Sequence, residues 1–156
     1  MRSSISVSTI LCLSLIGCTP AHIVRLSAPP ESERAEVLVH RESAFNHGGV
    51  GLVFGADKRD FVQLNNGEYA RLYLPSGNHS FFVRSTQADK PYELSASLLA
   101  NQTTCFKASA NPENFAKALL PFTFHLSNSF LLERVSCLSE AEIAKYSSVK
   151  VEYEKN

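Results

Sequence analysis

The stretch "LNNGEYARLYLPSGNHSFFV", residues 64–83, sets the pattern from which the fold can be predicted. The triplet "NNG" is a hairpin signal, because asparagine and glycine both tolerate the positive φ of a tight turn. The strand "EYARLYL" that follows ends at "PSG", where proline presets φ and glycine relieves the turn. The segment "NHSFFVRS" is expected to return as the partner strand, with His79, Phe81 and Val83 on one side. The stretch therefore predicts two tight turns between β-strands.

Similar short strands continue on both sides of this stretch. Apolar residues alternate in "AEVLVHR" at Ala35, Val37 and Val39, and the run "YELSASLL" from Tyr92 has one buried and one wet face. The segments "VGLVF" and "FVQL" flank a charged hairpin loop, "GADKRD", and "TTCFKAS" reads as a later strand. Turn signals recur about every 8 to 12 residues, which is the spacing expected of an all-β sandwich or barrel.

The C-terminal half adds helix signals to the strands. In "NPENFAKALL", Asn111 can cap a helix and Pro112 occupies the first helical position, where its missing N–H costs nothing. Ser139 and Glu142 form a capping box for a short helix in "SEAEIAKYSS". The segments "FTFHL", "FLLERVS" and "VKVEY" read as strands. We therefore predict a mainly β protein, a single antiparallel β-sandwich with one or two short helices in its C-terminal half.

The stretch 64–83 resembles a recurrent unit of small bacterial lipoproteins and PEGA-like domains. The unit has a leucine, a turn ending in glycine, an aromatic strand, Pro-x-Gly-x-His and an apolar strand. The matching positions are Leu64, Gly67, Tyr69, Pro75, Gly77 and His79. The resemblance covers about residues 35–83, and "FLLERVSCLSEAEI" is loosely similar to the closing strand and helix of such lipoproteins. It implies a β-sandwich of immunoglobulin or transthyretin type, and it implies no catalytic residues.

The first residues have the three parts of a secretory signal. Arg2 lies near the start, an apolar centre runs from Ile5 to Ile16, and Gly17 is the small residue at the cleavage point. The apolar centre is too short to span a bilayer, which needs roughly 20 residues. Because "LIGC" ends at Cys18, this segment resembles a bacterial lipobox, which implies a diacylglycerol on the Cys18 thiol. The alternative is that Cys18 is a chance cysteine in an ordinary signal.

The lipobox reading divides the chain into three parts. Residues 1–17 are the expected lipoprotein signal peptide, residues 18–34 an acylated cysteine with a flexible tether, and residues 35–156 the β-sandwich domain. Acyl chains contribute about 0.8 kcal/mol per buried methylene, so two or more chains give stable attachment. By resemblance to Gram-negative lipoproteins, Thr19 after the cysteine favours the outer membrane. The domain is then expected to face the periplasm, with the membrane as its partner through the lipid.

Two cysteines, Cys105 and Cys137, remain beyond Cys18 in the expected mature chain. The periplasm allows disulfides to persist, so we expect a bridge between them. The alternative is two buried free thiols, because sequence does not report the distance between the two Cα atoms.

Composition excludes some function classes. Removal of the signal leaves 139 residues with 14 basic and 15 acidic side chains, and a chain without basic clusters has no electrostatic footprint for nucleic acid. We expect no cofactor, no metal and no catalytic residue, because the nucleophile, metal-ligand and phosphate-loop motifs are missing. His79 could be a ligand or base with His40, His47 or His125 as partners. The alternative is a half-buried strand histidine whose ring bonds a turn carbonyl.

Three functions stay open. The leading hypothesis is a non-enzymatic lipoprotein that scaffolds or recognises another envelope component, with strand addition at a sheet edge as a natural binding mode. The alternative is a binding module for a small ligand or cell-wall component, in a pocket lined by Tyr69, Tyr73, Phe82 and Tyr92. The third is an unrecognised hydrolase, which would need a serine or cysteine beside a histidine.

Overall fold

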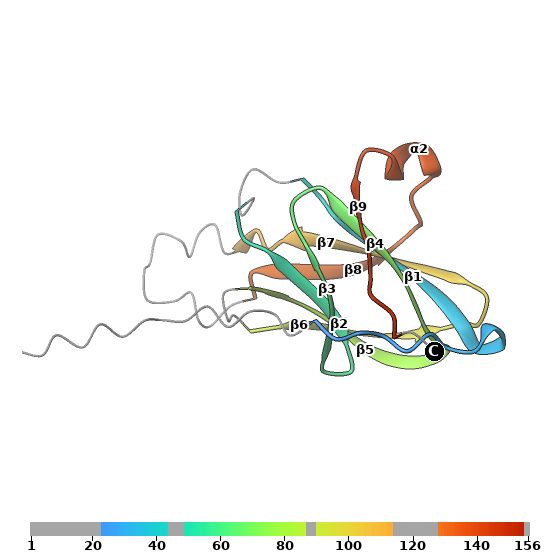
Figure 1. Cartoon of the computed structure of the whole chain (residues 1–156). Coiled ribbons are helices and arrows are strands. Elements are labelled where there is room, and N and C mark those ends of the chain that lie inside the picture. The colour runs from blue at the N-terminus through green and yellow to red at the C-terminus, as the bar shows by residue number, and fades with distance from the viewer. Residues whose placement is uncertain (1–22, 44–48, 87–89, 114–127, 155–156) are drawn as a thin grey trace, which may run out of the picture.

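The structure, a computed structural model, describes residues 23–43, 49–86, 90–113 and 128–154. The expected signal peptide and Cys18 lie outside these residues, as do the "FTFHL" segment and most of "NPENFAKALL". Within the described residues the chain is mainly β, with very little helix (Figure 1). The elements are η1 (Glu31–Glu33, a 3₁₀-helix), β1 (Arg34–Arg41), β2 (Leu52–Ala56), β3 (Arg59–Leu64), β4 (Glu68–Pro75), β5 (Gly77–Ser85), β6 (Tyr92–Leu98), β7 (Thr103–Ala110), β8 (Phe130–Val135), α2 (Glu140–Ile143) and β9 (Ser147–Val149).

The smaller sheet has four strands in the order β3-β2-β5-β6, and all its pairs are antiparallel. The charged "GADKRD" loop joins β2 to β3 as the predicted hairpin. Asp57 and Lys58 form its turn with φ of 52° and 64°, the left-handed conformation that a two-residue type I′ turn requires.

The larger sheet has five strands in the order β8-β7-β1-β4-β9. Its β1–β7 and β4–β9 pairs are parallel, so the predicted single antiparallel β-sandwich is antiparallel in most of its strand pairs but not in these two. Parallel neighbours need a long connection, and each of these pairs is separated in sequence by several strands. Local turn signals therefore could not reveal them.

The two turns of the opening stretch connect different sheets. Gly67 has φ of 72° and Gly77 has φ of 134°, so both glycines serve the tight turns predicted for them. However, β4 pairs with β1 and β9, whereas β3 and β5 belong to the four-stranded sheet. The expected hairpins at "NNG" and "PSG" were therefore wrong. A turn sets where the chain reverses, but the apolar face of β4 is buried across the core from the sheet that contains β3 and β5.

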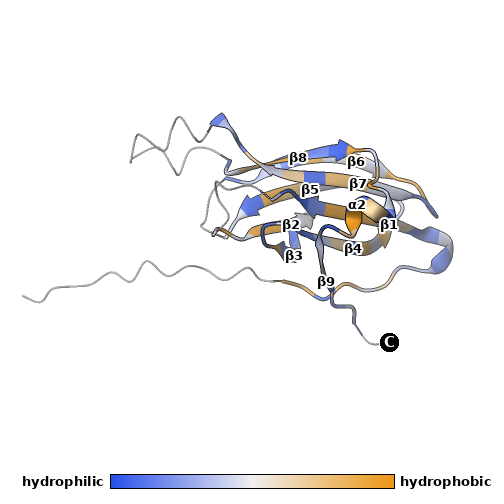
Figure 2. Cartoon of the chain, turned by 90° about the horizontal axis from the view of Figure 1, so that it is seen from above, coloured by the Kyte–Doolittle hydropathy of each residue, from blue (hydrophilic) through white to orange (hydrophobic). Residues whose placement is uncertain are grey.

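The two sheets face each other across one shared core, in a sandwich-like arrangement. Phe54 of β2 and Phe81 of β5 contact Phe106 of β7, with ring centroids 6.1 and 4.6 Å apart. Figure 2 shows hydrophobic and hydrophilic stretches along the same strands, and in β4 buried and exposed residues alternate from Ala70 to Pro75. The "YELSASL" strand β6 has this pattern throughout, with its apolar side chains more buried than the polar ones.

A buried arginine closes one end of the core. Arg41 lies at the end of β1 with 3% of its surface exposed. Its Nη1 donates to the carbonyl oxygens of Val50 and Leu64 at 2.7 and 2.9 Å, and its guanidinium lies 4.8 Å from the ring centroid of Phe130. These contacts satisfy a charge that would be costly to bury alone.

The segment before β1 packs on the domain. The N–H of Val24 donates to the carbonyl of Asp60, and Leu26 exchanges main-chain hydrogen bonds with Glu152 and Glu154. Leu26 is 3% exposed and belongs to the core. Residues 23–34 therefore do not form the flexible tether that we expected, because the buried Leu26 side chain and main-chain hydrogen bonds to β3 and to the segment after β9 hold them.

The C-terminal segment covers part of the outer face of the five-stranded sheet. Ile143 of α2 packs on Leu38 and Cys105, so β1 is buried on both faces. The capping box at Ser139 and Glu142 is present, as predicted. Cys105 and Cys137 form a disulfide with Cα atoms 5.1 Å apart, which joins the chain before α2 to β7.

Candidate functional site

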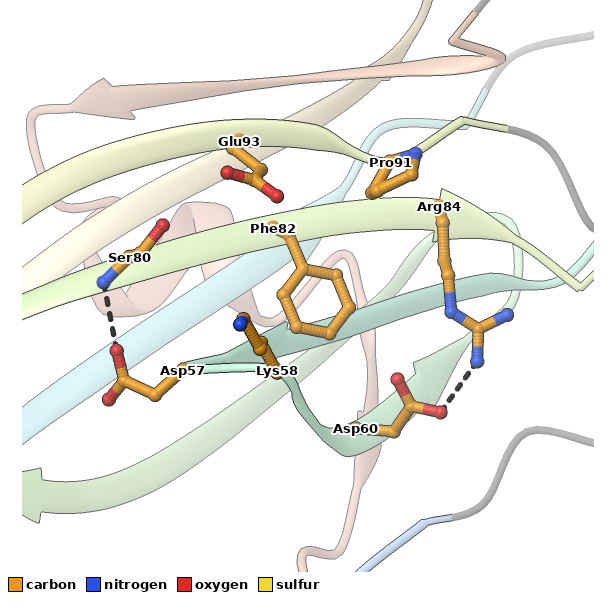
Figure 3. Close-up of a pocket in the computed structure, with 8 residues that line it drawn as sticks. All are labelled: Asp57, Lys58, Asp60, Ser80, Phe82, Arg84, Pro91 and Glu93. Atoms are coloured by element: carbon orange, nitrogen blue, oxygen red, sulfur yellow. Dashed lines mark hydrogen bonds and ion pairs between the residues drawn. The ribbon is translucent and has the colours of Figure 1, made fainter.

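A groove lies on the outer face of the four-stranded sheet, and we call it the Phe82 groove. Its volume is about 540 Å³. It is formed by the β2–β3 turn together with outward-facing side chains of β3, β5 and β6. Figure 3 shows the Phe82 ring between Glu93 and Lys58, with the Arg84–Asp60 pair to one side. The lining residues are Asp57, Lys58, Asp60, Ser80, Phe82, Arg84, Pro91 and Glu93.

A glycine makes room for the aromatic ring of the groove. Gly55 of β2 is the register partner of Phe82, and the β2–β3 register shifts between Phe54 and Gly55. A Cβ on Gly55 would lie 2.5 Å from the Phe82 ring and 2.1 Å from the Arg59 carbonyl oxygen. Phe82 is therefore packed against bare backbone, and only 8% of its surface is exposed. The Phe82 ring is thus a buried part of the groove wall, and apart from Pro91 the other lining residues are polar or charged.

The charges around the groove are partly matched. The Arg84 guanidinium binds the Asp60 carboxylate at 2.5 Å, and both side chains are half-buried or more. Within the described parts of the chain, neither the Lys58 ammonium nor the Glu93 carboxylate has an ion-pair or hydrogen-bond partner. One cation and one anion therefore remain available on opposite sides of the Phe82 ring.

An aspartate–histidine pair lies at one end of the groove. His79 Nδ1 is 2.7 Å from the Asp57 carboxylate, and Nε2 is 2.9 Å from the Pro75 carbonyl oxygen. An imidazolium donates from both nitrogens and would satisfy both acceptors. Burial raises the pKa of Asp57, but hydrogen bonds from His79 and the Ser80 N–H outweigh it and lower this pKa below its ordinary value.

The structure supports the simpler interpretation of His79. Its ring bonds the carbonyl of the "PSG" turn, as that interpretation predicted, and both nitrogens are engaged. His40 lies on the other sheet, packed edge-on against Tyr146, and burial lowers its pKa. His47 and His125 lie outside the described residues. Among the residues that the structure places, no three potential metal ligands come together.

The predicted aromatic pocket does not form. Tyr69 and Tyr73 lie on β4 in the five-stranded sheet, where Tyr69 packs near Leu38. Phe82 lies on β5 in the other sheet, and Tyr92 of β6 packs against the core. This pocket was the alternative to simple surface or core packing of the four rings, and it is excluded because β4 and β5 belong to different sheets. The charged β2–β3 turn was not recognised from the sequence as part of a groove. Gly55 could have indicated it, because a glycine inside a strand often marks close approach of another group to the backbone.

The edge of the four-stranded sheet at β6 adjoins the groove, and hydrogen bonds show which of its main-chain groups are open. Ser80 of β5 exchanges two bonds with Asp57: Asp57 N–H donates to Ser80 O, and Ser80 N–H donates to the Asp57 carboxylate. The main chain of Ser80 thus points away from β6. Because Ser95 is the register partner of Ser80, Ser95 also points away from β5, as do Glu93 and Ser97.

The β6 edge, defined by the outward main chain of Glu93, Ser95 and Ser97, differs from the other three sheet edges. The N-terminal segment contacts the β3 edge through Val24. The edge strand β9 has three residues, and β8 carries adjacent charges at Glu133 and Arg134. The seven-residue strand β6 has no proline or lysine, and its register with β5 is unbroken. Its main chain has no partner on the open side among the described residues.

Comparison with known proteins does not assign a function to this site. No protein-family model, curated protein or solved structure matches the chain. Among the described residues, no helix is both long enough and apolar enough to cross a membrane. The groove and the β6 edge are therefore interpreted from their own geometry.

Proposed function

We propose that the chain is a non-enzymatic lipoprotein of the bacterial envelope whose domain is a scaffold or protein-interaction module. The observation that carries this proposal is the β6 edge, where the outward N–H and C=O groups of Glu93, Ser95 and Ser97 have no main-chain partner among the described residues. Such an edge is a template for an added strand, and most proteins cover or charge such edges. No described segment covers the β6 edge, and Glu93 is the one charged side chain in the strand.

The anchoring half of the proposal comes from the N-terminal sequence. The segment ending at Cys18 would be cleaved and acylated, which would hold the domain at the outer membrane, facing the periplasm. Four residues separate Cys18 from Ile23, where the chain is bonded to the domain, so the five Cα-to-Cα steps between them span at most about 18 Å. Mass spectrometry of the processed N-terminus tests the anchor: we expect an acylated Cys18, and an unmodified N-terminus beyond it would refute the lipoprotein.

The interaction half predicts capture of a protein at the β6 edge. A photoreactive diazirine side chain at Ser97, in the full chain in intact cells, is expected to form covalent protein adducts on illumination. The same group at Lys150, an exposed residue beyond β9, is the matched control. Adducts at position 97 and few at position 150 support the proposal. Equal yields at both positions, or none at position 97, would refute it.

The resemblance to PEGA-like lipoproteins also proposes a finer fold type, an immunoglobulin or transthyretin sandwich. The fully antiparallel four-stranded sheet supports that type. The β1–β7 and β4–β9 pairs of the other sheet are parallel, which differs from the antiparallel sandwich that the resemblance implies.

The second candidate function is a binding module for a small ligand or cell-wall component. The Phe82 groove favours it, because its volume suits a small molecule and Lys58 and Glu93 offer opposite unpaired charges beside it. Titration with a soluble disaccharide–peptide fragment of peptidoglycan, followed by calorimetry, tests this function. Saturable binding that Glu93→Gln weakens would support it, whereas no heat at millimolar fragment would exclude that class of ligand.

A further inference from the structure

We infer that the β6 edge pairs with the β6 edge of a second copy of this chain, antiparallel about a two-fold axis at Ser95. The inference rests on the proposed function, because it names the partner of the same edge. Identical edges must pair isologously in a closed dimer, so the sequence of β6 has to complement itself in reverse. The symmetry centre then determines every pair of residues across the interface.

A centre at Ser95 uses every open main-chain group. Glu93, Ser95 and Ser97 all point outward, so the pairs Glu93 with Ser97, Ser95 with Ser95, and Ser97 with Glu93 each exchange two hydrogen bonds. A centre at Glu93 would place two carboxylates opposite each other, which is destabilising. A two-fold axis at Leu94 would place Ser97 opposite Pro91, which has no N–H, so Ser97 would lose its pair of hydrogen bonds. The charge and the hydrogen-bond pattern therefore select the same register.

The inner face of β6 complements itself in this register. Tyr92 would lie opposite Leu98 of the second copy, and Leu94 opposite its Ala96. Tyr92, Leu94 and Ala96 face the core but are only half-buried, because the sheet ends at β6. Leu99, directly after the strand, is 55% exposed. A second copy would continue the sheet and cover these apolar groups.

Confinement to a membrane would favour this pairing. A single edge-to-edge contact buries less surface than the standard protein interface, so the dimer is expected to be weak in dilute solution. Attachment of both copies to one bilayer would raise their effective concentration, which strengthens association without new contacts. The pairing must therefore be measured on the anchored chain.

The test captures the dimer in intact cells. Two full chains with different epitope tags are co-expressed, each with the diazirine side chain at Ser97, and adducts are scored for both tags. We expect an adduct that has about twice the mass of one processed, tagged chain and that carries both tags. The variant Ser95→Pro removes the central N–H donor but no bond to β5, because that N–H points outward. It is expected to lower the two-tag adduct at least about tenfold, and Ser95→Thr, which keeps the N–H, is the control.

A second variant is needed because proline at position 95 could lower the adduct by disturbing the fold. Ser95→Lys keeps the main chain intact but places two ammonium groups opposite each other in the dimer, so it should also lose the two-tag adduct. Adducts only with other proteins would overturn self-pairing while leaving strand addition in place. Absence of any adduct at position 97 would refute both proposals. A two-tag adduct unaffected by Ser95→Pro and Ser95→Lys would refute the Ser95-centred register.

Discussion

Reduction of the Cys105–Cys137 disulfide should lower the stability of the protein by an amount that the loop length predicts. The two cysteines are 32 residues apart in sequence. In the chain-entropy model, a crosslink over this separation stabilises the fold by about 3.7 kcal/mol at 25 °C, because it restricts the unfolded chain. With a urea m-value of about 2 kcal/mol/M, the unfolding midpoint should fall by about 2 M on reduction.

The assay is urea unfolding of the full chain with and without a phosphine reductant, followed by circular dichroism. The double variant Cys105→Ala with Cys137→Ser is the control, and its midpoint should be low and insensitive to reductant. Its stability should be slightly lower than that of the reduced chain, since Cys105 packs on Leu38 and Ile143. A wild-type midpoint that moves by less than about 0.5 M would refute the reasoning, because the bridge would then not restrict the unfolded state.

Three further perturbations test the account of the site and its surroundings. The pKa of Asp57 is lowered in the fold, so the stability that Asp57 contributes is present above its unfolded pKa and is lost as the pH falls through its folded pKa. The unfolding free energy should therefore fall more steeply between about pH 5 and pH 2 for wild type than for Asp57→Asn. Parallel curves for the two proteins would contradict this. Gly55→Ala should destabilise the fold by about 1–3 kcal/mol in urea unfolding, because its Cβ meets the Arg59 carbonyl as well as Phe82. A second change, Phe82→Leu, should not restore wild-type stability. Leu26→Ala should cost about 2–4 kcal/mol in the same assay, whereas a free tether would give a change below about 0.5 kcal/mol.

The strands of the domain could be predicted because their signals are local. Alternation of apolar residues in "YELSASL" and the tight turns at Gly67 and Gly77 depend on neighbours in the chain, and the structure confirms them. The disulfide could be proposed by counting, since two cysteines remained after Cys18. The charged "GADKRD" hairpin was predicted for the same local reason, although its residues were not recognised as part of a groove.

The groove could not be predicted because it depends on which strands are neighbours. Phe82 and Gly55 are 27 positions apart in sequence, and they meet only because β5 pairs with β2. Tyr73 and Phe82, which seemed to lie on adjacent strands, are on different sheets. The tether prediction failed for a similar reason, since the partners of Leu26 are Glu152 and Glu154 at the far end of the chain.

The sequence by itself determined the strand-rich class, the positions of most described strands and turns, and the faces of those strands that are buried. Tertiary structure alone decided the division into two sheets, the parallel pairs, the groove and the open edge at β6. The physical reason is that a period of two reports which side of a strand faces the core but says nothing about its neighbours. Neighbours are chosen by packing and hydrogen bonding between segments that are distant in the chain.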